Sequence, residues 1–344
     1  MANKVQIGID IGSTNVKIIK VEKQNPIKVV SALGAPIPSG SFSSDNEADQ
    51  EVIAATIKKL LDDTHIHEHA AICALPESQV FTRVIEVPPL SEEELSSALR
   101  WQAEQYIPLP LSEVTMDFSI ISKPEESKDK MKVLLVAAPL RVVNRQIKIL
   151  SLCGLTATAL ETELIAVSRV FSPLSQADKA ILIIDAGAGT TDAAVVTNGI
   201  VLFTRSIAVG GDAITRSIAE NFNLSLQQAE EYKKAYGLVE TELQGKVRQA
   251  SQPIVGTMVD ELKKVISYYQ EKYSKSKLTT VVVCGGASLL PGFTSYLADH
   301  LGLEVQVGNP WEKLNASDPT LKISQSLASS FACATGLALR DFVS

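Results

Sequence analysis

Two short segments of the chain combine an aspartate with glycines and hydroxyl residues. The first spans residues 10–14, and the second, in altered form, spans residues 185–191. Glycines let backbone N–H groups crowd around an anion because no Cβ stands in the way. A carboxylate cannot bind phosphate itself, but Mg²⁺ is commonly held through one or two carboxylates together with phosphate oxygens. The segments therefore predict a paired site for a Mg²⁺-polyphosphate, in which Asp10 and Asp185 hold the metal through water.

Each segment lies between two apolar stretches that predict β-strands. Residues 5–9 and 181–184 come before the segments, and residues 16–21 and 193–196 come after them. This pattern is typical of a hairpin with a polar turn. Two such hairpins, about 175 residues apart, indicate a duplicated α/β chain. Either segment alone is ordinary turn chemistry, and it is the repetition that favours a phosphate site.

A third segment supports the same site. Residues 280–284 read as a buried strand that ends in Gly285-Gly286, and Phe293–Leu301 follows as a helix. Two glycines allow a flat ring or a sugar to approach closely, although the same turn occurs in many α/β proteins. Lys17, on the second strand of the first hairpin, can place a positive charge on the phosphates.

The composition indicates a globular protein and argues against several partners. Of 344 residues, 45% are apolar and 21% charged, with a net charge of −7. No run of Lys or Arg stands out, which argues against nucleic acid and against direct adhesion to anionic lipid. Four scattered cysteines without an export signal predict reduced thiols in the cytoplasm. The uncharged stretches 278–298 and 323–339 contain glycine, proline or hydroxyl residues, and they predict core elements, not membrane spans.

The order of the three segments resembles that of the actin, heat-shock-chaperone and sugar-kinase ATPases, whose two phosphate motifs precede an adenosine motif. Residues 209–212 are similar to a Gly-Gly-Asp stretch of the same superfamily. The resemblance implies an α/β chain with the duplicated actin-like (ribonuclease H-like) ATPase fold, and ATP or ADP with Mg²⁺ as ligand. It assigns nucleotide binding to Asp10, Gly12, Ser13, Thr14, Asn15, Lys17, Asp185, Gly187, Gly189, Thr190, Thr191, Gly210, Gly211, Asp212, Gly285, Gly286, Ala287 and Ser288.

One helix narrows the resemblance to a branch of this superfamily. Residues 225–237 predict a helix with a capping box at Ser225 and a terminal Gly237. The segment is similar to the Ala-Glu-x-x-Lys-x-x-x-Gly segment of the FtsA/PilM branch, where the acid and the lysine face the adenosine. The resemblance gives these roles to Glu230 and Lys233, whereas the pattern alone also suits a solvated charged helix face.

The middle of the chain predicts a small β-α-β-β-α unit. Its strands are expected over residues 81–87, 114–121 and 131–137. Its helices are expected over residues 91–106, with a capping box at Ser91, and over residues 141–153. In position and order the unit resembles subdomain 1C of the same branch, inserted into the first lobe. The expected division is a first lobe over 1–79, subdomain 1C over 80–155, a return to the first lobe over 156–180, a second lobe over 181–320, and a C-terminal helix over 321–344 that packs back on the first lobe.

Residues 106–114, with Asp117 shortly after, strongly resemble the PilM family of type IV pilus assembly proteins. FtsA proteins normally extend into an amphipathic membrane helix, whereas this chain stops at Ser344 without a basic amphipathic face. The resemblance implies an actin-like ATP-binding scaffold in the cytoplasm, peripheral to the inner membrane.

The partners follow from the same resemblance. A groove beside subdomain 1C is expected to hold the N-terminal tail of PilN, with candidate residues on the strands over 81–87 and 131–137, which by pattern alone are also ordinary core strands. PilO, the pilus motor ATPases and the platform protein are implied indirectly. The membrane is reached only through partners, and self-association stays open.

Hydrolysis requires a residue that orients the attacking water. In the superfamily an acid just before the second phosphate hairpin often serves, which points to Glu161 and Glu163 at the start of a helix predicted over 164–171. Both acids also suit a helix N-terminus, where the dipole favours negative charge. We expect ATP binding with slow hydrolysis or none, the nucleotide acting as a conformational ligand between the two halves.

The sequence is also compatible with other functions. An FtsA-like cell-division tether would need its own membrane helix, and a general secretion-platform protein would carry the same fold. A sugar kinase would need a catalytic aspartate facing a sugar cleft, and a chaperone ATPase would need a further domain. His65, His67 and His69 alternate and could bind Zn²⁺, but they lie between a predicted helix and a predicted strand, so we expect a surface loop.

Overall fold

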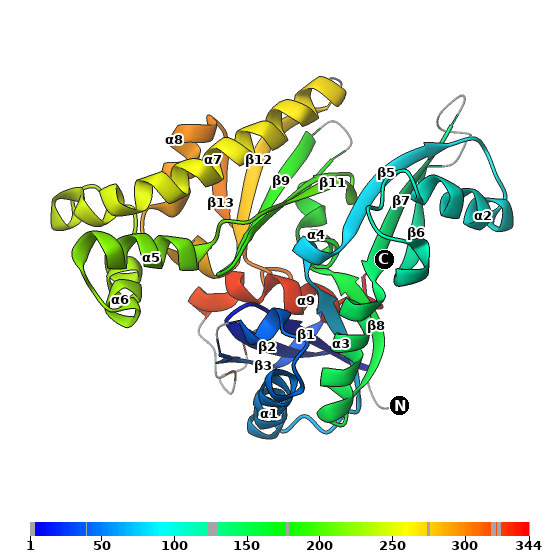
Figure 1. Cartoon of the computed structure of the whole chain (residues 1–344), viewed down its shortest axis with the longest axis horizontal. Helices are drawn as coiled ribbons and strands as arrows, with labels where there is room; N and C mark the ends of the chain where they lie inside the picture. The colour runs from blue at the N-terminus through cyan, green and yellow to red at the C-terminus, as the bar shows by residue number, and fades with distance from the viewer. Residues whose placement is uncertain are drawn as a thin grey trace.

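The first hairpin forms the centre of a five-stranded sheet in the computed structural model, which describes residues 4–38, 40–122, 130–176, 179–273, 276–317, 321 and 325–343 (Figure 1). β1 (Val5–Ile11) and β2 (Asn15–Glu22) pair antiparallel as predicted. β3 (Lys28–Pro36), β4 (Ala70–Leu75) and β8 (Thr156–Thr162) complete the order β3-β2-β1-β4-β8. Because β4 and β8 run parallel to β1, their carboxyl ends lie at the same edge as the hairpin tip.

Helices cover both faces of this sheet. α1 (Glu47–Asp63) and α3 (Leu140–Leu152) pack on one face, and α9 (Ala332–Ala338) lies on the other beside α4 (Glu163–Phe171) (Figure 1). The contact between α9 and β1 is backbone to backbone. A Cβ on Gly8 would stand 2.1 Å from the carbonyl oxygen of Ala334, so only glycine lets the helix lie directly on the strand.

The second hairpin begins an eight-stranded sheet. β9 (Lys179–Ala186) and β10 (Thr191–Thr197) pair antiparallel as predicted, β11 (Ile200–Ile207) pairs with β10, and β12 (Lys277–Cys284) and β13 (Glu304–Val307) add in parallel. α5 (Gly211–Phe222), α7 (Lys246–Lys272) and α8 (Phe293–Leu301) share one core with this sheet, while α4 packs on its other face. α4 therefore lies between the two sheets and contributes to both lobes (Figure 1).

The predicted capping boxes are confirmed. α6 (Leu226–Tyr236) begins after Ser225 and ends at Gly237, and α2 (Glu92–Ala103) begins after Ser91. Short 3₁₀ turns complete the chain: η1 (Ser41–Ser43), η2 (Glu77–Gln79), η3 (Leu111–Glu113), η4 (Ser172–Leu174), η5 (Glu242–Gly245), η6 (Gly286–Leu289) and η7 (Gln325–Phe331).

The small subdomain contains β5 (Phe81–Val87), α2, β6 (Val114–Ser122) and β7 (Met131–Pro139). Its strands form an antiparallel ladder, and one side of this ladder packs on α2 around Leu95 and Leu99. β5 also joins the second sheet, where Arg83 pairs with Phe203 of β11. The strand order β13-β12-β9-β10-β11-β5-β7-β6 thus runs from the second lobe into the small subdomain.

The helix expected to close the small subdomain packs elsewhere. Ile149 and Leu150 of α3 belong to the core of the first lobe, together with Ile53 and Ile57 of α1. By packing, the small subdomain therefore ends with β7, near residue 139. The sequence predicted the helix α3 correctly. Its apolar face, however, does not indicate whether it packs on the first lobe or on the small subdomain.

The C-terminal segment differs in detail from the single helix expected over 321–344, of which residues 322–324 and 344 lie outside the described residues. It consists of η7 followed by α9. Ser330 Oγ donates to the carbonyl oxygen of Leu327, and such local hydroxyl bonds compete with regular helix. In the part of the chain that the structure describes, no helix combines the length and the apolar character needed to cross a membrane.

Candidate functional site

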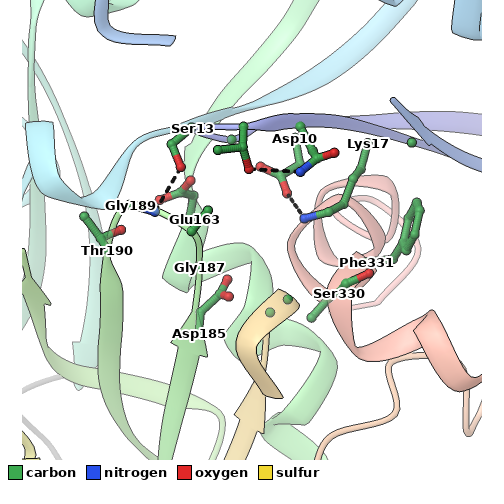
Figure 2. A pocket seen from close by; sticks show the side chains of 18 of the residues that line it. Asp10, Ser13, Lys17, Glu163, Asp185, Gly187, Gly189, Thr190, Ser330 and Phe331 are labelled. Carbon is green, nitrogen blue, oxygen red and sulfur yellow. Dashed lines mark hydrogen bonds and ion pairs between the residues drawn. The ribbon is translucent and has the colours of Figure 1, made fainter. Parts of the chain in front are cut away.

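The two hairpin tips meet across a cavity of about 620 Å³ (Figure 2). The N–H of Gly189 donates to Ser13 Oγ at 3.0 Å, which joins the tips directly. The cavity brings together twelve of the residues predicted to bind nucleotide: Asp10, Gly12, Ser13, Thr14, Asn15, Lys17, Asp185, Gly187, Gly189, Thr190, Gly285 and Gly286. Residues some 175 positions apart in sequence thus face the same space, as the duplication predicted.

A second cavity of about 830 Å³ adjoins the first and shares the backbone of Gly187 and Gly286 with it. It is lined by α5, α6 and η6, and includes the predicted residues Gly211, Asp212, Glu230, Lys233 and Ala287. The two cavities form one cleft between the lobes. Most residues predicted for phosphate line the first cavity, and Glu230, Lys233 and Ala287, predicted for adenosine, line the second, while Gly285 and Gly286 of the adenosine segment also reach the first.

Three of the predicted nucleotide residues lie behind the cleft instead of lining it. The Thr191 hydroxyl is buried and donates to the carbonyl oxygen of Val209 at 2.7 Å. Gly210 lies against the second tip, where a Cβ would stand 2.4 Å from the carbonyl oxygen of Ala188. The buried Ser288 hydroxyl donates to the carbonyl oxygen of Gly285. These residues hold the loops in place and do not face the cavities.

The two tips share one turn geometry. The N–H of Gly12 donates to the carbonyl oxygen of Asn15, and the N–H of Gly187 donates to that of Thr190, both at 2.9 Å. Gly285 locks the third loop against the second tip: its φ is +81°, and a Cβ would meet Asp185 Oδ1 at 2.3 Å. Glycine at this position lets the adenosine-side loop lie directly on the aspartate.

Acidic side chains crowd the end of the cleft where the tips meet. Burial raises the pKa of Asp185 to about 7, with Asp10 and Asp192 adding to the shift and Lys17 opposing it. Burial likewise raises the pKa of Glu163 well above its usual range, reinforced by Asp192 and Asp10. Burial alone would lower the pKa of the Lys17 ammonium, but Asp10 and Asp185 outweigh it and the pKa is raised. Lys17 Nζ lies 3.5 Å from Asp10 Oδ2.

A divalent cation fits this cluster. Asp192 Oδ1 is buried without a hydrogen-bond partner, and burial raises the pKa of this carboxyl to about 6. A cation beside the carboxylates would favour their ionised forms. Asp10 and Asp185, one from each tip, would hold Mg²⁺ through its water. In the described ranges, which include the three histidines of the 65–69 segment, no three or more His, Cys, Asp or Glu side chains are grouped to bind a metal ion directly, so water and phosphate oxygens would have to complete the ligands of such a cation.

Glu230 and Lys233 act as a pair at the other end of the cleft. Lys233 Nζ lies 2.6 Å from Glu230 Oε2, donates to the carbonyl oxygen of Gly211 at 3.0 Å, and is buried. The Thr215 hydroxyl donates to Glu230 Oε2 at 2.6 Å. Burial would raise the pKa of Glu230, but the hydrogen bonds from Lys233 and Thr215 outweigh it and the pKa is lowered. The Glu230–Lys233 pair connects α6 to the start of α5. The exposed Lys234 contacts the other oxygen of Glu230 and also lines the cavity.

The two candidate acids for hydrolysis lie in different places. Glu163 lines the first cavity at the N-terminus of α4 (Figure 2). Glu161 does not line the cleft, because its carboxylate is bound by Arg169 through two contacts of 2.8 and 2.9 Å and by Arg340 at 2.8 Å. Only Glu163 is therefore placed to act on a bound triphosphate, and Glu161 ties α4 to the C-terminal segment.

Sequence reasoning missed several residues of the cleft. Ser330 and Phe331 reach it from η7 (Figure 2). Leu327 reaches it from the same turn, and Asp192 from the strand after the second tip. Asp192 could have been found, because it follows directly on the second phosphate segment. The C-terminal residues carry no local signal, since only the packing of α9 on β1 brings them there.

A protein-family model and a solved structure both match nearly the whole chain. The family model described as type IV pilus assembly protein PilM matches residues 8–342. The solved PilM-PilN type IV pilus biogenesis complex contains a chain that is 29% identical, with a TM-score of 0.86, covering 97% of this chain and 98% of that one.

More distant relatives share the fold. Cell division protein FtsA of Bacillus subtilis (strain 168) is 22% identical over 375 residues, covering 96% of this chain and 84% of FtsA. MreB 5 of Spiroplasma citri, solved bound to AMPPNP, has a TM-score of 0.52 at 15% identity, covering 98% of this chain and 96% of that one. The two-lobed architecture is therefore the actin-like ATPase fold that the sequence predicted.

Proposed function

Because the chain belongs to the PilM family of type IV pilus assembly proteins, we propose that it is an actin-like, ATP-binding scaffold that holds the N-terminal tail of a PilN-type partner. The observation that carries this proposal is the likeness to the chain of the PilM-PilN complex, which extends over 97% of this chain. In this role the protein is peripheral to the inner membrane and connects a PilN/PilO pair to the assembly motors and the platform protein.

The proposed nucleotide is ATP or ADP with Mg²⁺. Mg²⁺-ATP supplies a triphosphate whose charge the metal partly neutralises. The glycine-rich tips carry backbone N–H groups for the phosphates, Lys17 lies beside Asp10, and the pair Glu230–Lys233 lines the adenosine end. What supports this assignment is that both aspartate-bearing tips face one cavity.

Turnover is expected to be slow or absent. Glu163 is the acid that faces the phosphate end, and burial raises its pKa well above the usual range, which favours the protonated form of this carboxyl over the ionised one. A protonated carboxyl is a poor acceptor for the attacking water's proton. In our proposal the nucleotide acts mainly as a conformational ligand that determines how the two lobes are arranged relative to each other.

The tail is proposed to lie on one side of the small subdomain. Leu134 and Val136 of β7 are half-buried and point away from the α2 core. On the same side of β7, Ala138 packs against Leu75 and Val142 of the first lobe. An apolar strip that runs from one subdomain into the next suits a short peptide, which needs apolar anchors to bind with useful affinity.

A direct binding experiment tests the proposal. A fluorescein-labelled PilN N-terminal peptide is titrated with the protein, with and without Mg²⁺-ATP, and followed by anisotropy. Val136→Asp should weaken binding about tenfold or more, because it places a charge in an apolar anchor site. Ser96→Asp, which adds the same charge on exposed α2, should leave binding unchanged. Failure of the peptide to bind while a tubulin-like protein binds would instead favour an FtsA-like tether.

A further inference from the structure

A second groove, of about 500 Å³, lies where β11 meets β5 and has α7 as its wall. We call it the α7–β5 groove; the residues that matter for its chemistry are Arg83, Phe203, Arg205, Lys264, Tyr268 and Lys272. It shares no residue with the two cavities of the nucleotide cleft. The proposed function gives it no role.

The groove is positively charged in an acidic protein. Its lining contains four cations and one carboxylate, Glu261, whereas the whole chain has a net charge of −7. Glu261 lies 3.1 Å from Arg205 and 2.5 Å from Lys264, whose side chains are 59% and 70% exposed. One carboxylate cannot neutralise four cations, so the groove keeps an excess of positive charge that faces solvent.

Aromatic side chains form the apolar part of the same groove. Tyr268 is 44% exposed and lies edge-on to Phe203, with ring centroids 4.9 Å apart. The Lys272 ammonium donates to the Tyr268 hydroxyl at 3.1 Å. At the far side the Arg83 guanidinium lies 4.6 Å from the centre of the Tyr106 ring. Tyrosine and arginine side by side are the residue types that dominate binding energy at interfaces.

The floor of the groove contains strand edges with little pairing. Phe203 and Arg83 form the one registered pair between β11 and β5 among the described residues, although each strand is paired along its other side. On either side of that pair the two strands face the groove without a ladder between them. Unpaired strand edges offer backbone donors and acceptors to an extended chain.

We propose that the α7–β5 groove docks an extended, acidic segment of a partner protein. The cations select negative charge, the aromatic pair offers an apolar anchor, and the strand edges suit an extended backbone. Single-stranded nucleic acid would use the charge and the aromatic rings but not the strand edges. Arg83 pairs with Leu135 and so projects on the α2 side of the ladder, opposite Leu134 and Val136. The Arg83 side chain therefore lies on the face of the ladder opposite the strip proposed for the PilN tail.

The test uses the full chain and a defined probe, the fluorescein-labelled heptapeptide Glu-Leu-Glu-Phe-Glu-Leu-Glu. Anisotropy should report saturable binding that weakens as NaCl is raised from about 50 mM to about 300 mM. The double substitution Arg205→Gln with Lys264→Gln should weaken binding about tenfold, because it removes two cations and leaves Glu261 unpaired. Tyr268→Ala should weaken it by a similar factor, because it removes the apolar anchor.

A matched control separates the groove from net charge. Lys4→Gln with Lys148→Gln makes the same charge change at two exposed ion pairs outside the groove, with Asp341 and Glu47, and should leave the probe bound as in the unmodified chain. Melting temperatures confirm that each variant is folded. A saturating PilN tail peptide should not displace the probe.

Three results would overturn the proposal. The first is no binding of the probe at low salt. The second is equal binding by the groove variants and the control variant. The third is that an octathymidylate oligonucleotide, and not the peptide, binds and is lost in the groove variants, which would make the groove a nucleic-acid site. Displacement of the probe by the PilN tail peptide would likewise refute a separate docking site.

Discussion

The backbone N–H of Glu77 donates a hydrogen bond of 2.9 Å to Oε2 of Glu163, the acid that faces the nucleotide cleft. The link is reciprocal, because the Glu77 carboxylate accepts from the N–H of Leu164 at the start of α4. Glu77 is buried; burial raises the pKa of its carboxyl, and Thr204 of β11 and Thr82 of β5 oppose the shift, which places the carboxyl beside both strands. A buried residue just before β5 therefore joins the cleft to the small subdomain.

This link predicts that Glu77→Ala uncouples nucleotide from partner. In the unmodified chain Mg²⁺-ATP is expected to change the affinity for the PilN tail peptide by about fivefold or more. In Glu77→Ala the factor should fall toward one, because the carboxyl that accepts from the start of α4 and lies beside β5 and β11 is lost. The variant should also lose about 1 to 3 kcal/mol of unfolding free energy, since the Leu164 N–H keeps no carboxylate partner.

Two variants serve as controls for this experiment. Glu77→Gln retains an acceptor oxygen and should retain the coupling. Glu86→Ala removes a half-exposed carboxylate from β5 and should change neither coupling nor stability by much. Equal coupling in Glu77→Ala and the unmodified chain, measured by anisotropy with and without Mg²⁺-ATP, would refute the link.

Asp185→Ala is expected to abolish stabilisation by Mg²⁺-ATP. A ligand that binds only the folded state raises its melting temperature, and at saturation the rise should be several degrees. Without Asp185 the second tip loses its carboxylate for the metal, so the rise should disappear. Asp299→Ala, an exposed acid of the second lobe, is the control and should keep the full rise. Unchanged stabilisation of Asp185→Ala would contradict the two-tip site.

The raised pKa of Asp185 predicts how stability depends on pH when Mg²⁺ and nucleotide are absent. The folded state holds this proton up to about pH 7, whereas the free carboxyl releases it near 3.8. Raising the pH between these values therefore favours the unfolded chain. Relative to Asp185→Asn, the unmodified protein should lose about 2 to 3 kcal/mol of unfolding free energy between pH 5 and pH 8. Urea unfolding followed by tryptophan fluorescence measures the difference; parallel curves would contradict it.

Glu163→Gln is expected to reduce any phosphate release to background while Mg²⁺-ATP still raises the melting temperature. The amide keeps the size of the side chain but cannot accept a proton from water. Glu161→Gln is the matched comparison, because it weakens the ion pairs with Arg169 and Arg340 at a site outside the cleft. It should lower the unfolding free energy by about 2 to 4 kcal/mol and leave phosphate release unchanged. Equal phosphate release by Glu163→Gln would remove Glu163 from the mechanism.

The sequence predicted the local elements of this fold well. Both hairpins form where they were expected, because alternating apolar residues and polar turns specify them locally. Ser91 and Ser225 cap their helices as expected, since a capping box is a contact over three residues. Duplication then predicted that the tips converge, and Asp10 and Asp185 do face one cavity.

What the sequence missed depends on contacts between distant segments. The choice between Glu161 and Glu163 required the position of Arg340, which reaches Glu161 from the C-terminal segment. The contribution of Phe331 to the cleft likewise follows from the packing of α9 on β1. The role of Glu77 requires β11 to lie beside β5, a pairing that no local pattern encodes. Contacts between such distant segments produce no periodic pattern in the sequence.

The junction between β11 and β5 has a mechanical consequence. On one side β5 is held to β7 by a ladder that runs from Phe81 to Val87, and on the other it is held to β11 at the single rung Arg83–Phe203 (Figure 1). We expect a force applied to the small subdomain to break that one pair before the ladder of seven pairs between β5 and β7, because fewer backbone hydrogen bonds hold it. The contact between the second lobe and the small subdomain would then open while the ladder stays intact.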